Sequence, residues 1–576
     1  MGFQVKQMMA ASCLLLLLLS SGGAIANQIT SDTSVDNEKV LFEQGKSIQV
    51  AASTNATSVE SRSEAKVAEL LRQLTKTKLS KVTAVLEQLE ATQDTSVRKL
   101  FQTLLDGSLY YQRESLRLLA IDKQGDGTLL ASDLLSGVSL GSVVKKSITK
   151  IRVNNRLRVY LRGALSRLAL TDPSAEVREA AVLSMLDKLN ADNVAALEMA
   201  ASVETAEEVR GLLLLALAMN TLSESDVQEE RLAAIELMSG RLESSVRNQL
   251  KTLINSSTES DLQVKAAATK SLKSIDGKVT AYGYIEQLFF GLSLGSVLLL
   301  AAIGLAITFG VMGVINMAHG EMIMIGAYAT FVVQQLMPNF LEYSIWVAIP
   351  AAFLTAGLVG VLIERCVIRY LHGRPLETLL ATFGISLILQ QAVRTIFSPL
   401  NQTVVTPEWM SGSLEINAVL SVTYSRIYIF IFALIVFAAL QMVMKKTSLG
   451  LQVRAVSQNR NMAKSMGIRT DRVDALTFGL GSGIAGIAGV ALSQITNVGP
   501  NLGQAYIIDS FMVVVFGGVG NLLGTLFAGF SLGIANKFLE PATGAVLANI
   551  IVLVFIILFM QKKPKGLFPQ KGRAAE

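Results

Sequence analysis

The chain of 576 residues contains very little cysteine and histidine, with two of each. Cys13 lies in an apolar N-terminal run, and Cys366 lies beside a long apolar stretch. If the N-terminal run is removed, one cysteine is left and an internal disulfide is excluded. One cysteine, His319 and His372 are also too few for a structural zinc site, which takes four nitrogen or sulfur ligands. We therefore expect no metal and no other cofactor.

Charge is scarce as well, since 17% of the residues are charged and 51% are hydrophobic. The net charge of +6 does not call for nucleic acid, because much of the basic excess lies in short loops beside apolar stretches. A nucleotide-binding loop is missing too. Gly45-Lys46-Ser47 lacks the earlier glycine of a phosphate loop, and Gly481–Gly486 lies inside an apolar stretch rather than after a strand. The sequence thus predicts no ATP site and no enzyme activity; the protein works passively or takes energy from another subunit.

The N-terminal segment is typical of an export signal. Lys6 precedes a short apolar run, and the segment ends in Ala24-Ile25-Ala26, the small-residue pattern of a cleavage site. We expect residues 1–26 to be a signal peptide cleaved after Ala26, with an uncleaved anchor as the alternative. Residues 27–59 are polar and predict a disordered leader. In both cases the domain that follows is exported.

Residues 60–275 predict an exported helical domain with a repeat. Val209, Val227, Val246 and Val264 each precede a basic or polar residue, and they are spaced 18, 19 and 18 residues apart. Two helices per repeat give a unit of about 37 residues, which is typical of α-solenoids, and Asp172–Ala181 resembles a HEAT repeat. Each valine is expected to face the neighbouring helical layer. The segment as a whole favours a scaffold or docking surface.

Residues 106–150 interrupt this helical pattern with glycine, serine, aspartate and short β-prone runs, which predicts a small β-containing insertion. Within it, the twelve residues from Asp122 to Asp133 imitate a calcium-binding loop. An EF-hand takes a bidentate glutamate at its last position and a helix on each side. The last position here is the shorter aspartate and the flanks are β-like, so we interpret the segment as a tight turn.

The second half of the chain carries the long apolar stretches and predicts a transmembrane domain over residues 283–562, followed by a tail at 563–576. A bilayer core about 30 Å thick takes roughly 20 apolar residues per helix. The expected fold class is therefore all-α, with a polytopic helical membrane domain behind an exported α-solenoid. The seven strong stretches are 287–311, 318–337, 345–363, 378–397, 427–444, 474–495 and 543–560.

The charges of the connecting segments predict the orientation of the spans. Basic residues favour the cytoplasmic side. They gather in Glu364–Arg374, in Lys445–Arg472 and in the tail after Gln561. The segments expected outside have no basic residue, or only Arg426, and they are 338–344, 398–426 and 496–506.

An eighth apolar region, 507–537, is broken by Gly517–Asn521. An exported N-terminal domain and a cytoplasmic tail require an odd number of crossings. The region is therefore either a re-entrant hairpin, giving seven crossings, or two crossings, giving nine. Broken backbone at membrane depth is tolerated where protein or a water-filled cavity covers it. The region is a pathway candidate, with Asp509 as a gate residue or a helix cap.

Asn316, His319 and Glu321 place polar side chains between the first two apolar stretches. Ionisable groups at membrane depth are costly and mark a pathway or a turn that serves one. The alternative is a wetted cytoplasmic hairpin. The predicted orientation places the three residues at the cytoplasmic end of both spans, which favours local hydrogen bonds that hold a turn for His319 and Glu321.

Four segments in this order resemble the branched-chain amino-acid type permeases of ABC importers, over about residues 280–570. They are Ile303–Glu321, Arg374–Gly384, Phe511–Asn521 and Pro564–Phe568. A long exported domain with HEAT-like repeats makes the chain similar to the urea permeases of this family. The basic loop Asn461–Gly467 resembles the coupling loop of ABC permeases, although only its third small residue and its final glycine match.

The resemblance implies a multi-pass subunit of an ATP-driven importer in the bacterial inner membrane. Its partners would be a second permease subunit, two ATP-binding subunits and a periplasmic substrate-binding protein. Urea is the leading substrate, and a small neutral molecule of this kind needs amide, hydroxyl and backbone partners. The candidate pathway residues are Asn316, His319, Glu321, Thr382, Ser386, Gln390, Asp509 and Asn521, and the candidate coupling residues are Arg454, Asn461, Ala463 and Gly467.

Three other functions stay open at this point. The first is an ABC permease for branched-chain amino acids or short amides. The second is a membrane-anchored solenoid that binds a protein partner and transports nothing. The third is a passive urea channel, whose uptake would survive the removal of ATP.

Overall fold

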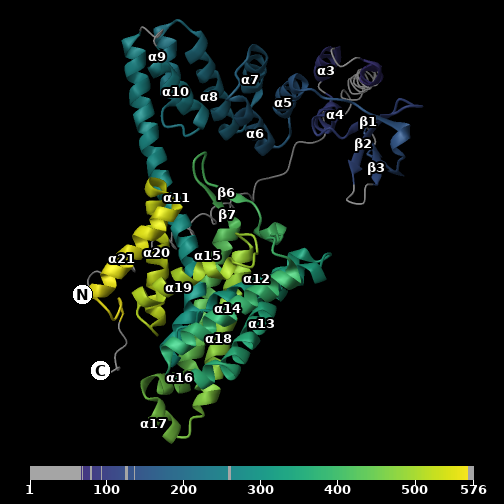
Figure 1. Cartoon of the computed structure of the whole chain (residues 1–576). Coiled ribbons are helices and arrows are strands. Elements are labelled where there is room, and N and C mark those ends of the chain that lie inside the picture. Colours follow the sequence, from purple (N-terminus) through teal and green to yellow (C-terminus); the bar gives the residue numbers. More distant parts are fainter. Residues whose placement is uncertain are drawn as a thin grey trace, which may run out of the picture. The chain divides into compact units, whose positions relative to one another are not determined.

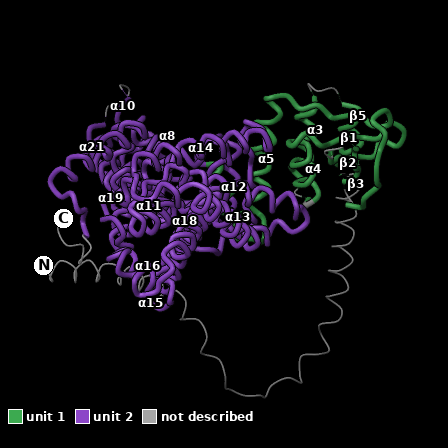
Figure 2. Tube along the Cα trace, turned by 60° about the horizontal axis from the view of Figure 1, so that its bottom comes forward, with its two compact units in different colours: residues 1–185 green, residues 186–576 purple. Residues whose placement is uncertain are grey.

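A computed structural model describes residues 67, 69–77, 81–92, 94–123, 128–134, 137–256 and 261–568. The expected signal peptide and leader, and the last eight residues of the tail, lie outside these residues. The described chain forms two compact units, one up to Met185 and one from Leu186 onward (Figure 2). Each unit is described by itself.

The first unit combines helices with a small antiparallel sheet. Its helices include α3 (Val82–Glu90), α4 (Thr95–Leu105), α5 (Asn155–Ala169) and α6 (Ala175–Met185). The sheet has the strand order β4-β3-β2-β1-β5. Its strands are β1 (Leu109–Gln112), β2 (Leu118–Lys123), β3 (Leu129–Asp133), β4 (Ser139–Ser142) and β5 (Ile148–Lys150). The predicted β-containing insertion is confirmed.

The calcium-like segment lies between paired strands rather than between helices. β2 and β3 are antiparallel, with Lys123 opposite Leu129, so the connection between them is a hairpin. Asp133 is buried and accepts a hydrogen bond from Arg117. Residues 124–127 lie outside the described part of the chain. The strand flanks agree with the interpretation as a turn.

The second unit begins with four helices, of which the first packs against the second and the second against the third. They are α7 (Ala191–Val203), α8 (Glu207–Glu224), α9 (Gln228–Met238) and α10 (Ser244–Asn255). Val209, Val246 and Val264 are buried, as expected for valines that face a neighbouring helix. The same prediction is wrong for Val227, which is 51% exposed. Val227 is the residue before the first turn of α9, so it does not share the buried face of that helix.

A single helix of 51 residues, α11 (Leu262–Met312), continues from this group of helices into the apolar half of the chain (Figure 1). At 1.5 Å per residue it is about 77 Å long. Asp261 caps its first turn by accepting hydrogen bonds from the backbone N–H groups of Gln263 and Val264. The boundary predicted between the exported and transmembrane domains, near residues 275–283, lies within this continuous helix.

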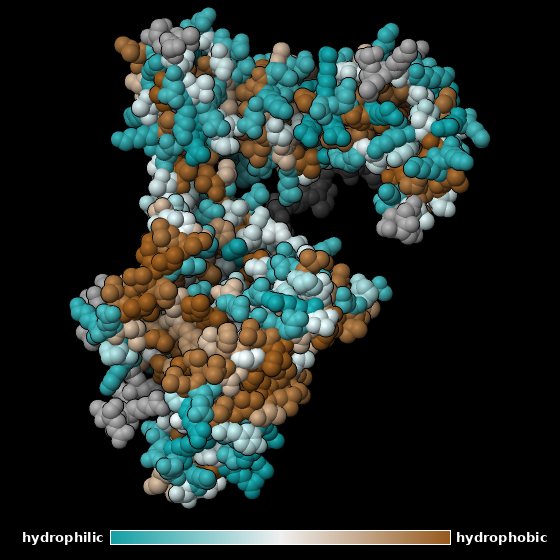
Figure 3. Space-filling view, viewed as in Figure 1, coloured by the Kyte–Doolittle hydropathy of each residue, from teal (hydrophilic) through white to brown (hydrophobic). Residues whose placement is uncertain are grey.

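The apolar half consists of packed helices with two short strands. After α11 come α12 (His319–Leu336), α13 (Ser344–Cys366), α14 (Pro375–Phe397), β6 (Ser413–Glu415), β7 (Ser421–Thr423), α15 (Tyr424–Lys446), α16 (Ser448–Gln458), α17 (Arg460–Ser465), α18 (Thr470–Ser493), α19 (Leu502–Gly517), α20 (Leu522–Thr543) and α21 (Ala545–Lys562). Hydrophobic side chains gather over the body of these helices, and the end formed by α16 and α17 is hydrophilic (Figure 3).

Seven helices among the described residues are long and apolar enough to cross a membrane. The polytopic helical fold is therefore confirmed. These seven helices differ in one member from the seven apolar stretches expected from the sequence. α12 is not among them, and α20 takes its place. Residues 318–337 form α12 as predicted, but the polar residues at its two ends lower its mean hydropathy. α19 is also apolar, but it has only 16 residues.

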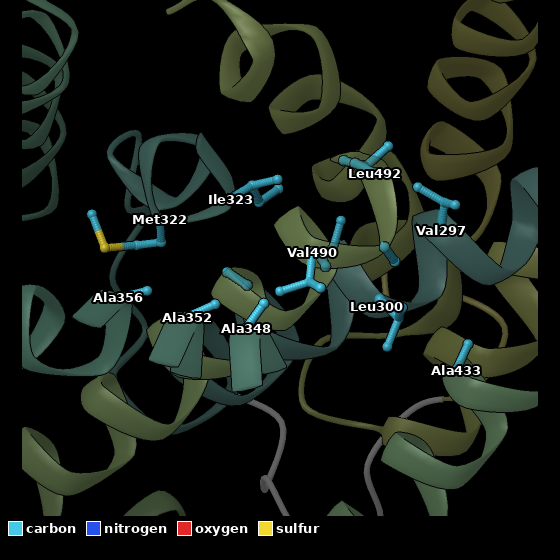
Figure 4. Packing of buried hydrophobic residues seen from close by; sticks show 14 of the residues in the cluster. Val297, Leu300, Met322, Ile323, Ala348, Ala352, Ala356, Ala433, Val490 and Leu492 are labelled. Carbon is cyan, nitrogen blue, oxygen red and sulfur yellow. The ribbon is translucent and has the colours of Figure 1, made fainter. Parts of the chain in front are cut away.

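Small residues let α11, α12, α13 and α18 approach closely. A Cβ added to Gly326 of α12 would lie 2.0 Å from the carbonyl oxygen of Gly486 on α18. Ala348, Ala352 and Ala356 repeat every four residues on α13 and belong to the same buried cluster (Figure 4). In a bilayer no hydrophobic force drives helices together, so contacts of this kind supply the packing energy.

We expect Gly326→Ala to destabilise the protein, because its new methyl group would overlap the backbone of α18. Overpacking of this kind costs about 1–3 kcal/mol. Gly384→Ala on α14 is the matched control, since a Cβ at Gly384 meets no atom within 4 Å. Thermal unfolding of the purified proteins in one detergent measures the difference. Equal midpoints for the two variants would contradict the close approach of α12 and α18.

Candidate functional site

The polar cluster predicted near Glu321 forms where α12 begins. Gly313, with φ +66°, ends α11, and a short loop then leads into α12. Nε2 of His319 is 2.8 Å from the carbonyl oxygen of Ala301. Since a carbonyl only accepts, Nε2 carries the proton. Ala301 lies 11 residues before Met312, or roughly 16 Å back along the helix. The loop therefore returns beside α11, and α12 begins well inside the helical body.

Glu321 lies in the same interior position. Its Oε1 accepts a hydrogen bond from Ser386 Oγ at 2.9 Å and another from Gln390 Nε2 at 2.7 Å. Ser386 lies midway along the 23 residues of α14. Glu321 therefore lies beside the middle of α14 rather than at its end, and the cytoplasmic side of the cluster stays a prediction. The side-chain hydrogen bonds are not local, because those of Glu321 join α12 to α14 and that of His319 joins α12 to α11.

α14 presents a polar stripe toward this position. Thr378, Thr382, Ser386 and Gln390 are buried and recur every four residues, which places them on one face of the helix. Most other α14 side chains are exposed or half-buried and apolar. The stripe explains why a carboxylate can be buried here, since the donors that it needs come from the neighbouring helix.

Two buried acceptor atoms of the cluster lack a hydrogen-bond partner among the described residues. They are Oε2 of Glu321, whose residue is 1% exposed, and Nδ1 of His319. Nearly all buried polar atoms in proteins are paired, so such an atom calls for an explanation. Both can accept a hydrogen bond, Oε2 as a carboxyl oxygen and Nδ1 as the unprotonated nitrogen of a neutral ring. A ligand rich in N–H donors would satisfy them.

Asn316 and Thr382 have partners within the protein. Oδ1 of Asn316 accepts from the backbone N–H of Ala318 at 3.0 Å. Oγ1 of Thr382 accepts from the backbone N–H of Met317 at 3.2 Å and donates to the carbonyl oxygen of Leu379 at 3.0 Å. These bonds fix the loop before α12 and attach it to α14. Both residues therefore position the start of α12.

The start of α19 packs against the start of α12. A Cβ added to Gly320 would lie 2.5 Å from the carbonyl oxygen of Gly503. Beside this contact, Arg394 of α14 donates from Nη2 to Oδ1 of Asn501 at 2.8 Å. Two helices thus begin side by side next to the polar stripe of α14. Sequence reasoning missed Arg394, although a basic residue that continues the four-residue spacing of the stripe was a usable signal.

Asp509 and Asn521 lie apart from the Glu321 cluster. Asp509 is half-buried on α19, six residues beyond Gly503, and is not among the hydrogen-bond partners of Glu321. Asn521 caps α20 by accepting from the backbone N–H of Gly524 at 3.2 Å. Its Nδ2 also donates to the carbonyl oxygen of Phe568 at 3.1 Å. The broken region is therefore the end of α19, a short turn and α20, with the chain's tail bound to the turn.

The predicted coupling residues divide into inward and outward positions. Ala463 is buried, whereas Arg454 is exposed and donates to the carbonyl oxygen of Met444. Asn461 is exposed, and Gly467 ends the short helix α17 with φ +88°. Met462 and Met466 beside them are also exposed and were missed by the sequence reasoning. The signal that could have identified these two methionines is an apolar side chain within an otherwise basic loop.

A buried ion pair fixes this loop to the helical body. Arg460, the first residue of α17, pairs with Asp474 of α18, whose side chain is buried. Burial, and to a lesser extent the positive charge of Arg460, lowers the pKa of His372, so the ring is neutral at pH 7. The ion pair between Arg460 and Asp474 holds α17 in a defined orientation, in which Met462 and the cap residue Met466 are exposed.

We expect Ser386→Ala to destabilise the folded protein, because it removes one of two donors to a buried carboxylate. An unsatisfied buried group of this kind costs about 1–3 kcal/mol. Thr395→Ala on the same helix is the control, since that hydroxyl is exposed and bonds only to the carbonyl oxygen of Gln391. Chemical denaturation in detergent compares the two. A loss for Thr395→Ala as large as that for Ser386→Ala would show that Glu321 does not depend on the hydroxyl.

Comparison with known proteins shows what the apolar half of the chain is similar to. The family model described as "Branched-chain amino acid transport system / permease component" matches residues 287–560. The high-affinity branched-chain amino acid transport system permease protein LivH of Salmonella typhimurium is 32% identical over 297 residues, which is 49% of this chain and 95% of that protein. The corresponding permease protein BraD of Pseudomonas aeruginosa is 31% identical over 295 residues, 50% of this chain and 96% of the relative.

A more distant likeness extends to a permease named for another substrate. The ribose import permease protein RbsC of Escherichia coli is 25% identical over 284 residues, 48% of this chain and 84% of that protein. No solved structure matches the chain. The helices α3 to α10 lie before the region that the family model matches.

Proposed function

Because the chain belongs to the family of permease components of branched-chain amino acid transport systems, we propose that it is the permease subunit of an ATP-driven importer for a small neutral amide, with urea as the leading substrate. The seven apolar helices make it a multi-pass membrane protein. The proposed partners are a second permease subunit, two ATP-binding subunits and a substrate-binding protein. The proposed site of the complex is the bacterial inner membrane, with the N-terminal helices outside.

The unpartnered Oε2 atom of Glu321 is the observation that carries the choice of substrate class. Urea carries four N–H bonds and one carbonyl oxygen, so it can donate to Glu321 Oε2. A substrate carboxylate beside this oxygen would meet an acceptor or a like charge, which is unfavourable away from water. The site therefore favours neutral donors over carboxylates.

The packing at the starts of α12 and α19 supports a pathway at this position. Both helices begin beside the polar stripe of α14, and each is preceded by a non-helical segment. Non-helical backbone at membrane depth is tolerated where it lines a protein-covered or water-filled route. With α12 and α19 each counted as a crossing together with its preceding segment, the chain has nine crossings. That odd number agrees with an exported N-terminal domain and a cytoplasmic tail.

Branched-chain amino acids are the second candidate substrate, since LivH and BraD are named for them. A scaffold without transport is less well supported, because an anchor needs no buried carboxylate inside its helices. We propose that the group of helices from α7 to α10 docks the substrate-binding protein. Loss of uptake on deletion of residues 60–275 would support this role.

Uptake of labelled urea in a strain without the endogenous transporter tests the substrate and the site together. We expect unlabelled short amides to compete and leucine not to compete. Glu321→Gln keeps the shape of the side chain but replaces one oxygen with a donor, so we expect at least a tenfold loss of urea uptake. Glu377→Gln on the first turn of α14 is the control, because Glu377 is exposed and pairs with Arg374.

Several outcomes of this experiment would contradict the proposal. Competition by leucine alone would assign the chain to branched-chain amino acids. Urea uptake that survives depletion of ATP would assign it to a passive channel. Equal uptake by the two glutamate variants would remove Glu321 from the pathway.

We expect Gly467→Arg to abolish co-purification of the ATP-binding subunits and to reduce uptake at least tenfold. The substitution places a bulky charge beside α17 and forces a residue with a Cβ into φ +88°, at a cost of about 1–2 kcal/mol. Gly373→Arg is the control, since Gly373 also has a positive φ of +83° and open space around it. Equal losses for both variants would point to backbone strain rather than to the coupling surface.

A further inference from the structure

A cavity of about 510 Å³ lies between the end of α13 and the segment that joins α17 to α18. It is independent of the Glu321 cluster, because no residue lines both. Its charged lining comes from two places in the sequence more than ninety residues apart. The charged residues are Glu364, Arg365, Arg369, Lys464, Arg469, Asp471 and Arg472.

The lining carries an excess of positive charge, with five basic and two acidic residues. Nη2 of Arg369 is 3.0 Å from Oδ2 of Asp471, so that pair neutralises itself. The other four basic residues make no ion pair with any described residue, and they are Arg365, Lys464, Arg469 and Arg472. Like charges gathered around one cavity repel each other, so an anion between them would lower the energy.

The cavity lies where two apolar helices end. Arg365 and Arg369 are at and just after the C-terminal end of α13, and Arg469 and Arg472 are at the beginning of α18. Leu354, Leu358 and Leu362 are exposed on α13, and their spacing of four residues forms an apolar strip toward the cavity. An apolar strip that leads to a basic cavity has the shape of a phospholipid, with acyl chains along the strip and a headgroup in the cavity.

One buried acceptor at the cavity adds to this match. Glu364 is 2% exposed, and its Oε2 has no hydrogen-bond partner among the described residues. A phosphodiester has no hydrogen-bond donor and would by itself leave this oxygen unsatisfied. A headgroup that carries hydroxyl groups beside its phosphate can donate to it.

We propose that this cavity binds the headgroup of an anionic phospholipid of the phosphatidylglycerol type. The phosphate lies among the guanidinium groups of Arg365, Arg469 and Arg472, and a glycerol hydroxyl donates to Glu364. Arginine suits such a site because its planar group forms paired hydrogen bonds with phosphate oxygens. Lys464 and Gly467 place the site directly beside the proposed coupling surface, so the bound lipid would also steady α17.

The test is lipid binding to the purified full-length protein. Native mass spectrometry counts the phosphatidylglycerol that is retained during titration in mixed micelles, with phosphatidylcholine as the zwitterionic reference. We expect the triple variant Arg365→Gln, Arg469→Gln and Arg472→Gln to bind phosphatidylglycerol at least tenfold more weakly. The triple variant Lys445→Gln, Lys446→Gln and Lys562→Gln loses the same charge at other helix ends, and we expect less than a twofold change.

Four outcomes would overturn the proposal. Equal losses in both triple variants would show general attraction to basic residues, and equal retention of phosphatidylcholine would show no charge preference. Competition by inorganic phosphate or glycerol 3-phosphate at similar concentrations would assign the cavity to a free anion. Unchanged lipid binding with lost co-purification of the ATP-binding subunits would make the cavity a protein-docking surface.

A single variant keeps the test decisive if the first triple variant does not fold. Glu364→Leu removes the oxygen that accepts from the hydroxyl and leaves every basic residue in place. We expect this variant to lose the preference for phosphatidylglycerol over phosphatidylmethanol, an anionic phosphodiester that carries no headgroup hydroxyl. An unchanged preference would contradict the assigned role of Glu364.

Discussion

The close approach of helix backbones at glycine is the constraint on which the apolar half of this protein depends. A Cβ at Gly304 would lie 2.2 Å from the carbonyl oxygen of Gly481, and one at Gly489 would lie 2.0 Å from that of Ile323. These contacts join α11 and α12 to α18, and the apolar parts of α11 and α18 are 89% and 83% buried inside the structure. Lipid tails are as apolar as leucine, so the helices gain from dense packing rather than from leaving water. Replacing any of these glycines would push a whole helix away.

That packing also explains how a carboxyl group is accommodated inside the helical body. α12 begins beside α11 at Ala301, 11 residues before that helix ends, because its first turn fits between Ala301 and Gly503, with His319 and Gly320 at the two contacts. Glu321 is the next residue and is carried inward with them. The polar stripe of α14 then supplies its donors. Burial of an ionisable group away from water is costly without such partners, so α14 and α12 depend on each other.

Much of the architecture followed from periodicity and hydropathy. The apolar stretches at 345–363, 378–397 and 427–444 became α13, α14 and α15 because a long uniform stretch leaves the chain few alternatives to a helix. The β-containing insertion followed from its turn residues. The buried valines of α8, α10 and α11 followed from a repeat, which failed at Val227 because that residue precedes the first turn of α9.

The depth of the polar cluster could not be predicted in the same way. Loop charge fixes on which side a segment emerges, but not how far the chain turns back before its next helix begins. Asn316–Glu321 lies next to the end of α11 in sequence and beside its interior in space, because the six residues 313–318 return along the helix. The hydrogen bonds of Glu321 join residues 65 and 69 positions apart. Pairing over such distances depends on the packing of α12 against α14, which no local pattern encodes.

We propose that the unpartnered acceptors of the cluster take part in the transport cycle. A carboxyl oxygen left unsatisfied in the interior costs free energy in every state in which it has no donor. A substrate that donates to it recovers that free energy on binding and so lowers the cost of separating the starts of α12 and α19. Those starts meet at the backbone of Gly320 and Gly503, with the side chain of Ile507 beside them. We propose that these two helix ends part and meet again during transport, so that the same position holds a substrate in one state and excludes it in the other.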